Sequence, residues 1–141
     1  MKTFITKLQQ VEQSIGKEKG AFWLFALFLP QENIGLWDLL VCAPWIDADD
    51  TAALRFIVKR LKELVSSDDI ASLSHIALIE HDNPGLKDIW SAAQVEHGLV
   101  ELRDTTFFEK RIERALIITS RRPETSIGAE AYPPACRASV A

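Results

Sequence analysis

Acidic side chains gather at two places where apolar runs of the chain end. They follow the run that closes at Ala43 and the short run IALI. The residues concerned are Asp47, Asp49, Asp50, Glu80, His81 and Asp82. If the two runs are parallel strands, their carboxyl ends meet at one edge of a sheet, which is where sites in open α/β sheets form. Converging carboxylates bind Mg²⁺ or Mn²⁺, and such a metal activates water or stabilises a phosphoryl transition state. This reading predicts a divalent-metal-dependent phosphoryl or phosphodiester enzyme.

The same residues have a simpler interpretation, which we favour. Asp and Asn at the start of a helix accept hydrogen bonds from its free backbone N–H groups and complement its dipole. Arg121 and Arg122 reach the same edge if the last connection is a crossover, and there they would neutralise the acids. We therefore predict no metal and no cofactor, and Mg²⁺ or Mn²⁺ belongs to the enzyme alternative alone.

Asp38 is the one carboxylate inside an apolar run, and it shares a strand face with Leu36, Leu40 and Cys42. A charged group is costly to bury there. We interpret it as a buried acid near the strand start that accepts hydrogen bonds from the turn at residues 33–35. A functional role is the alternative, because perturbed carboxylates gather at sites.

His75 and His97 are expected at the opposite edge of the sheet from the acidic cluster. His75 begins one apolar run, and His97 lies just before another. An isolated histidine more often has a structural role than a catalytic one. We therefore assign neither to a site.

Several catalytic motifs are missing from the chain. It contains no GxGxxG, GxxxxGK, GxSxG or CxxC, the signatures of dinucleotide, P-loop, hydrolase and thiol-redox sites. The order helix, strand, strand, helix, strand resembles the restriction-endonuclease core, and Asp38 lies on a hairpin strand where those enzymes hold an acid. Their Glu or Asp two residues before a Lys is missing from both GLWDLLVC and IALIEHD. We infer no membership of that family, and whether the chain is an enzyme stays open.

Two apolar runs joined by a polar turn organise the expected fold. AFWLFALFL at 21–29 suits a strand buried on both faces, and residues 36–43 form its hairpin partner. Apolar stripes at helical spacing predict helices over 3–16, 51–65 and 84–93. Further short apolar runs predict strands over 75–79, 99–102 and 115–120. Residues 105–113 fit either a short helix or an extended segment.

This order of elements predicts an α/β fold of about five strands, with helices on both faces of the sheet. The sheet is expected to be mixed, antiparallel at the opening hairpin and mostly parallel afterwards, because strands joined through a helix are usually parallel. Residues 1–120 then form a single domain. Residues 121–141 hold three of the six prolines and no periodic pattern, so they are expected to be a tail.

Composition limits the class of protein. A chain of 141 residues with 48% hydrophobic and 26% charged residues is typical of one soluble domain. Its net charge of −4 makes nucleic acid an unexpected partner, and Glu32 and Asp38 interrupt the only stretch long enough to suggest a membrane hairpin. Two cysteines and no secretory signal predict a cytoplasmic protein.

The most favoured function is a non-catalytic module that binds a protein partner or regulates one, and that self-associates. Four Trp and seven Phe are more aromatic surface than a small sheet needs to bury, and aromatic residues favour interface cores. A two-fold dimer is the simplest arrangement. We name Trp37 and Trp45 as its candidate interface residues.

Overall fold

The computed structural model describes residues 2–32, 35–48 and 50–122 of the chain. In chain order the elements are α1 (Lys2–Lys19), β1 (Leu24–Pro30), β2 (Trp37–Cys42), α2 (Pro44–Ala48), α3 (Asp50–Leu64), α4 (Ser67–Ile70), β3 (Leu73–Leu78), α5 (Gly85–Ala92), β4 (Val100–Phe107) and β5 (Lys110–Ser120). The predicted tail lies outside the described residues, apart from Arg121 and Arg122.

The strands form one five-stranded sheet in the order β3-β2-β1-β5-β4. Only β2 and β3 are parallel. The pairs β1–β2, β1–β5 and β4–β5 are all antiparallel. The α/β class and the mixed five-stranded sheet are therefore confirmed, but the expectation of mostly parallel strands is wrong.

One error lies at the connection through α5, because β4 runs opposite to β3. The other lies in the stretch 105–113, which is a hairpin and not a crossover. β4 ends at Phe107 and β5 begins at Lys110. The two residues between them, Phe108 and Glu109, have φ angles of 53° and 63°. A two-residue turn with both φ angles positive matches the right-handed twist of the strands that it joins. Such turns usually carry Asn or Gly, so Phe-Glu contains no local signal for one.

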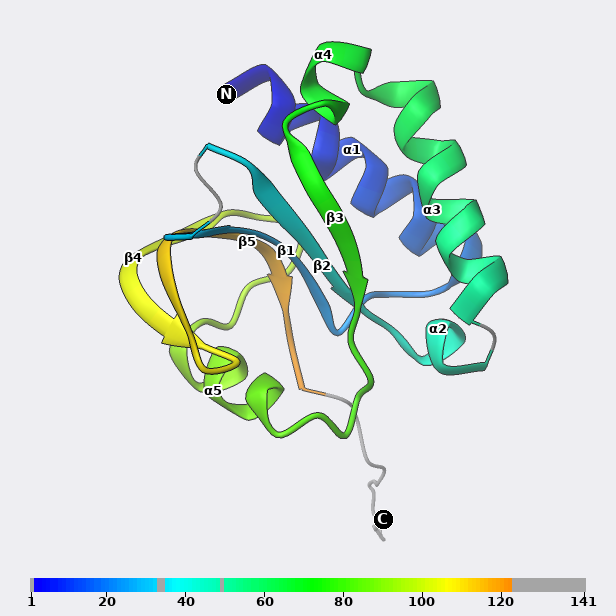
Figure 1. The fold of residues 1–141 in the computed structure, drawn as a ribbon. Coiled ribbons are helices and arrows are strands. Elements are labelled where there is room, and N and C mark those ends of the chain that lie inside the picture. Colours follow the sequence, from blue (N-terminus) through cyan, green and yellow to red (C-terminus); the bar gives the residue numbers. More distant parts are fainter. Residues whose placement is uncertain (1, 33–34, 49, 123–141) are drawn as a thin grey trace, which may run out of the picture.

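Helices cover both faces of the sheet, as the sequence predicts. In Figure 1, α1 and α3 lie together on one side and α5 lies on the other. Phe4, Leu8 and Val11 of α1 are buried in one core cluster with Ile57 and Leu61 of α3. Leu86, Ile89 and Trp90 of α5 belong to the second cluster, across the sheet. The sheet therefore separates two hydrophobic cores.

β1 contributes to both cores, which explains its unbroken apolar sequence. Phe25 and Leu27 face the core that contains α1 and α3. Leu24, Ala26 and Phe28 face the core that contains α5. These side chains are at most 2% exposed. The predicted burial of this strand on both faces is confirmed, although the strand begins at Leu24 and not at Ala21.

The second predicted helix, 51–65, corresponds to α3, and the short helix α2 precedes it. Only some of the apolar side chains of α3 are buried. Ala53, Ile57 and Leu61 are buried, whereas Leu54 is exposed. α3 is tied to α1 by a salt bridge of 2.8 Å between Arg60 and Glu18. No helix in the described part of the chain is long and apolar enough to span a membrane.

Candidate functional site

Three strands end at the same edge of the sheet, because β2, β3 and β5 run in the same direction (Figure 1). This edge holds α2, the segment 80–82 and Arg121 with Arg122. The arginines arrive there as predicted, but through the β4–β5 hairpin instead of a crossover. Glu80, His81 and Asp82 have exposed side chains.

The predicted acidic cluster is only partly visible. The side chains of Asp47 and Asp50 and all of Asp49 lie outside the described part of the structure. Among the residues that are described, no group of three or more His, Cys, Asp or Glu side chains could hold a metal ion. The metal-dependent enzyme therefore stays a prediction from the sequence, without a described ligand set.

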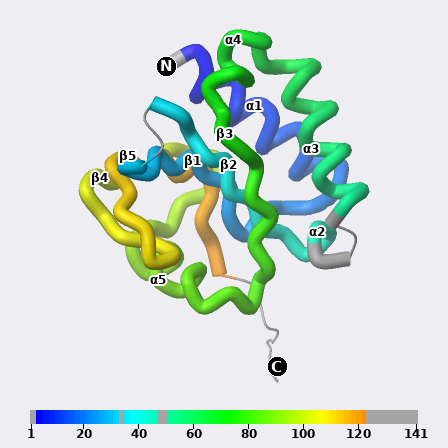
Figure 2. The backbone as a smooth tube through the Cα atoms, viewed as in Figure 1, coloured from blue at the N-terminus to red at the C-terminus, as the bar shows by residue number. Residues whose placement is uncertain are grey.

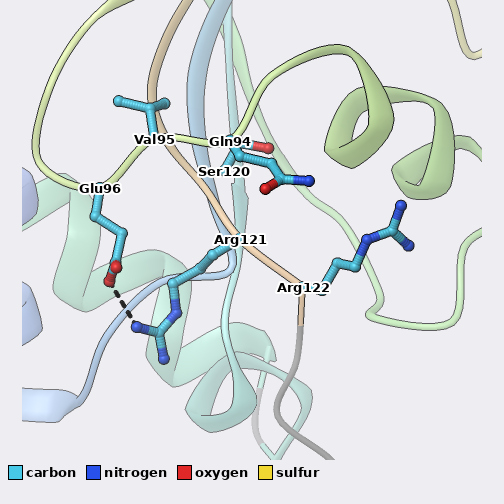
Figure 3. Close-up of a pocket in the computed structure, with 6 residues that line it drawn as sticks. All are labelled: Gln94, Val95, Glu96, Ser120, Arg121 and Arg122. Atoms are coloured by element: carbon cyan, nitrogen blue, oxygen red, sulfur yellow. Dashed lines mark hydrogen bonds and ion pairs between the residues drawn. The ribbon is translucent and has the colours of Figure 1, made fainter.

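The two arginines at this edge point away from each other (Figure 3). Arg121 Nη1 lies 2.6 Å from Glu96 Oε2, and Arg122 Nη2 donates to Ser91 Oγ at 3.2 Å. The hollow beside them, about 310 Å³, is also lined by Gln94, Val95 and Ser120. Glu96 thus forms a salt bridge with Arg121 at this hollow.

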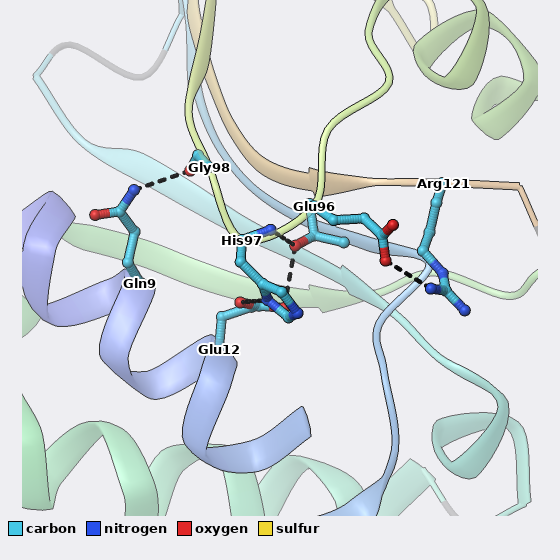
Figure 4. Close-up of polar contacts among 7 residues, drawn as sticks. Gln9, Glu12, Glu96, His97, Gly98 and Arg121 are labelled. Carbon is cyan, nitrogen blue, oxygen red and sulfur yellow. Dashed lines mark hydrogen bonds and ion pairs between the residues drawn. The ribbon is translucent and has the colours of Figure 1, made fainter. Parts of the chain in front are cut away.

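A buried carboxylate connects α1 to this edge (Figure 4). Glu12 is fully buried. His97 Nδ1 donates to Glu12 Oε1 at 2.7 Å, and Thr119 Oγ1 donates to Glu12 Oε2 at 3.0 Å. The backbone N–H of His97 donates to the same threonine hydroxyl at 3.1 Å. A buried carboxylate is tolerable only with such donors, because burial removes its hydrating water.

The position of His97 contradicts the sequence prediction. β4 runs antiparallel to β5, so the loop before β4 lies where β5 ends and not at the opposite edge. His97 has a φ of 54°, in the left-handed region, and Gln9 Nε2 donates to the neighbouring Gly98 carbonyl at 2.9 Å. We interpret this arrangement as an anchor that ties the 95–98 loop to α1.

The position of Glu12 in the sequence indicates a buried carboxylate. It lies four residues after Leu8 and three before Ile15, within the apolar stripe of α1. A carboxylate on a buried stripe needs a partner from elsewhere in the chain. The identity of that partner, 85 residues away, has no local signal.

Asp38 lies at the other end of the sheet and is 5% exposed. It is paired across β2 and β1 with Phe28, and its Oδ1 is 3.3 Å from His75 Nδ1. Burial raises the pKa of the Asp38 carboxyl above its usual range, while His75 and Lys110 partly oppose this rise and Glu32 adds to it. Hydrogen bonds to Asp38 were predicted from the turn at residues 33–35. Two residues of this turn, Asn33 and Ile34, lie outside the described residues.

A hollow of about 240 Å³ opens beside Asp38, on the same face of the sheet as α5. α5 has eight residues and covers only part of this face. The hollow is lined by Phe28, Pro30, Asp38, Leu40, His75, Ala77, Ile79, Phe107, Phe108, Lys110 and Ile112. Asp38 is thus the most deeply buried charged group of an otherwise mainly apolar wall.

Replacing Asp38 with asparagine is expected to raise the melting temperature by a few degrees at neutral pH. Because the folded-state pKa is raised, the contribution of Asp38 to stability is complete below its unfolded pKa and is lost as the pH rises through the folded value. The advantage of the Asn variant should therefore be largest near pH 7 and shrink toward about pH 4. Thermal unfolding of both proteins across this range checks the prediction, and an advantage that grows in acid would contradict it.

Trp37 and Trp45, which were predicted at an interface, make contacts within the described fold. Trp37 is 4% exposed, and the Arg114 guanidinium lies 5.6 Å from its ring centroid. Trp45 is half-buried, donates from Nε1 to the Gly20 carbonyl at 3.3 Å, and packs edge-on against Phe22. Trp37 therefore offers little surface to a partner.

The two edge strands of the sheet differ in how they are protected. β4 carries the exposed charged residues Glu101, Arg103 and Asp104. β3, with the sequence LSHIAL, contains no Lys, Arg, Asp, Glu or Pro. Charges and prolines are the usual means by which an edge strand avoids pairing with another chain.

No family model matches this chain, and comparisons with curated proteins and with solved structures find no match either.

Proposed function

We propose that this protein is a self-associating protein-interaction module, in which the β3 strands of two copies pair antiparallel about a two-fold axis. The observation that carries the proposal is the unprotected edge strand β3. Two five-stranded sheets would then join into one continuous sheet, with the same surface used on both copies.

The backbone of β3 supports this arrangement. The Ile79 N–H donates inward to the Val41 carbonyl at 2.9 Å. Alternate residues of a strand direct their N–H and C=O groups to opposite sides. Ile76 and Leu78 are in register with Leu39 and Val41. Their N–H and C=O groups therefore point away from β2. These are the groups that a second β3 would bind.

Apolar surface lies beside the same strand. A hollow of about 400 Å³ separates β3 from α3, and its walls include Leu54, Val58, Ile70 and Ile76. Figure 2 shows β3 at the rim of the sheet next to α3. A strand added to this edge would cover part of that apolar surface, which favours association.

Charge favours a second copy as the occupant. Antiparallel pairing places the carboxyl end of one β3, followed by Glu80, beside the amino-terminal half of the other. That half contains Ser74 and His75 but no acidic residue. Like charges therefore do not face each other across the two-fold axis, and Glu80 lies near an imidazole.

Ser74→Glu is expected to weaken dimerisation about tenfold, because it brings an acid close to Glu80 of the partner subunit twice per dimer. Ser74→Lys should keep or strengthen the dimer, since it introduces the opposite charge. Both substitutions fall on an exposed side chain, and Thr106→Glu on β4 is the matched control on the other edge.

Sedimentation equilibrium over a range of concentrations measures these effects. A wild-type protein that stays monomeric at every concentration would remove the proposal. Equal weakening by Ser74→Glu and Thr106→Glu would mean that β3 is not the interface.

A further inference from the structure

His97 joins a buried carboxylate to a hollow at the surface. Its Nδ1 donates to the Glu12 carboxylate at 2.7 Å, while the side chain of His97 is 47% exposed. The hollow beside it has a volume of about 220 Å³ and is lined by Gln13, Gly16, Lys17, Ala21 and His97. None of these residues belongs to β3, so the hollow is independent of pairing through that strand.

The carboxylate determines which ring nitrogen of His97 carries the proton. In a neutral imidazole one nitrogen donates and the other accepts. Because Glu12 Oε1 accepts from Nδ1, the lone pair lies on Nε2, on the far side of the ring from Glu12 (Figure 4). The Thr119 hydroxyl donates to the other carboxylate oxygen and accepts from the backbone N–H of His97. The imidazole is therefore held as an oriented nucleophile.

Two other side chains of the hollow provide hydrogen-bond donors. The Lys17 ammonium group and the Gln13 amide both carry N–H groups, and both side chains are exposed. In acyl transfer, such donors stabilise the oxyanion that forms when a nucleophile attacks a carbonyl carbon. Gly16 keeps the space open, because a Cβ atom at this position would meet none of the surrounding atoms within 4 Å. The hollow is smaller than usual ligand sites, so it admits only a short acyl group.

We propose that His97 is the nucleophile of an acyl-transfer site that hydrolyses aryl esters of short carboxylic acids. Nε2 attacks the ester carbonyl carbon and forms a carbon–nitrogen bond, and the carbon–oxygen bond to the aryl group breaks, so the aryloxide leaves with its electron pair. The resulting acyl-imidazolium keeps its proton on Nδ1 and is stabilised by the Glu12 carboxylate. Water then attacks the acyl carbon and the carbon–nitrogen bond breaks. This step releases the carboxylate and two protons, and it restores the neutral imidazole.

Release of 4-nitrophenolate from 4-nitrophenyl acetate measures the reaction. The reference protein and all variants carry Cys136→Ser, because the thiol of Cys136 would itself take up acyl groups. We expect the rate to saturate with ester concentration and to continue for many turnovers per protein molecule. It should exceed the rate with free 4-methylimidazole at the same concentration by at least about tenfold, because the hollow holds the ester beside Nε2.

His97→Asn separates the nucleophile from the anchor. Asn tolerates the positive φ of this position, and its amide can donate to Glu12 in place of Nδ1. The variant should therefore fold and still lose at least about tenfold in rate. His75→Asn is the matched control and should leave the rate unchanged, since His75 is also an exposed histidine beside a buried carboxylate but does not line this hollow.

Gly16→Leu tests the hollow without changing the imidazole. A leucine side chain would occupy the open space beside His97, and leucine is more favourable than glycine inside a helix. The rate should fall by at least about fivefold, while the melting temperature holds or rises. Thermal unfolding of each variant establishes that it is folded.

Three results would overturn the proposal. The first is a reference protein that reacts no faster than free 4-methylimidazole. The second is a folded His97→Asn variant that keeps the reference rate, or that loses no more of it than His75→Asn does. The third is full activity of Gly16→Leu, which would mean that the ester does not enter the hollow.

Discussion

Replacing His97 with alanine is expected to lower the free energy of unfolding by about 3 kcal/mol, a large loss for a side chain that is half exposed. The reason is Glu12, which is fully buried and accepts from His97 Nδ1 at 2.7 Å. Without the imidazole, the carboxylate keeps the Thr119 hydroxyl as a donor but loses its hydrogen bond to His97 Nδ1. Alanine also adopts a positive φ unfavourably, so the backbone strain at position 97 changes little.

Urea unfolding measures this loss. Glu96→Ala is the control, because it removes the exposed neighbouring side chain and should cost less than about 1 kcal/mol. In a Glu12→Gln background, His97→Ala should lose most of its effect, since the buried charge is already gone. A loss below about 1 kcal/mol in the wild-type background would mean that water replaces His97 at the carboxylate.

Replacing Phe25 with alanine is expected to cost about 4 kcal/mol, the range for a buried phenylalanine. Phe25 is the second residue of β1, is fully buried, and contacts Phe22 edge-on at 5.0 Å between ring centroids. Leu99→Ala, at a position that is 45% exposed, should change stability by less than about 0.5 kcal/mol.

The position of β1 inside the sheet predicts slow hydrogen exchange of its backbone amides. β1 is hydrogen-bonded on both sides, to β2 and β5, so its amides should exchange only through global unfolding. Faster exchange in β1 than in the edge strand β4 would contradict the central role of this strand. A Phe25→Ala cost below about 1 kcal/mol would do so as well.

The sequence by itself determined which segments are buried. Nine consecutive apolar residues at 21–29 required a strand covered on both faces, and that strand lies between two helical layers. The apolar stripe of the first helix likewise predicted its buried residues Phe4, Leu8, Val11 and Ile15. Such patterns are readable because burial depends on the side chain's own hydrophobicity and on the local period of the backbone.

The directions of β4 and β5 could not be predicted from local sequence patterns. Residues 105–113 lack Gly, Asn and Pro, so the sequence gives no signature of the turn that joins β4 to β5 at Phe108 and Glu109. The turn forms because β5 gains hydrogen bonds with β1 on one side and with β4 on the other. That gain depends on a strand about 90 residues earlier in the chain, which no local window contains.

Tertiary structure alone also decided which polar groups meet. Glu12 joins His97 because α1 packs beneath the loop before β4, and Asp38 joins a hollow because α5 is too short to cover its end of the sheet. A sequence shows that a buried carboxylate needs partners, since burial without them is too costly. Which partners it receives is settled only when distant elements pack, because long-range contacts depend on the whole arrangement of the sheet and its helices.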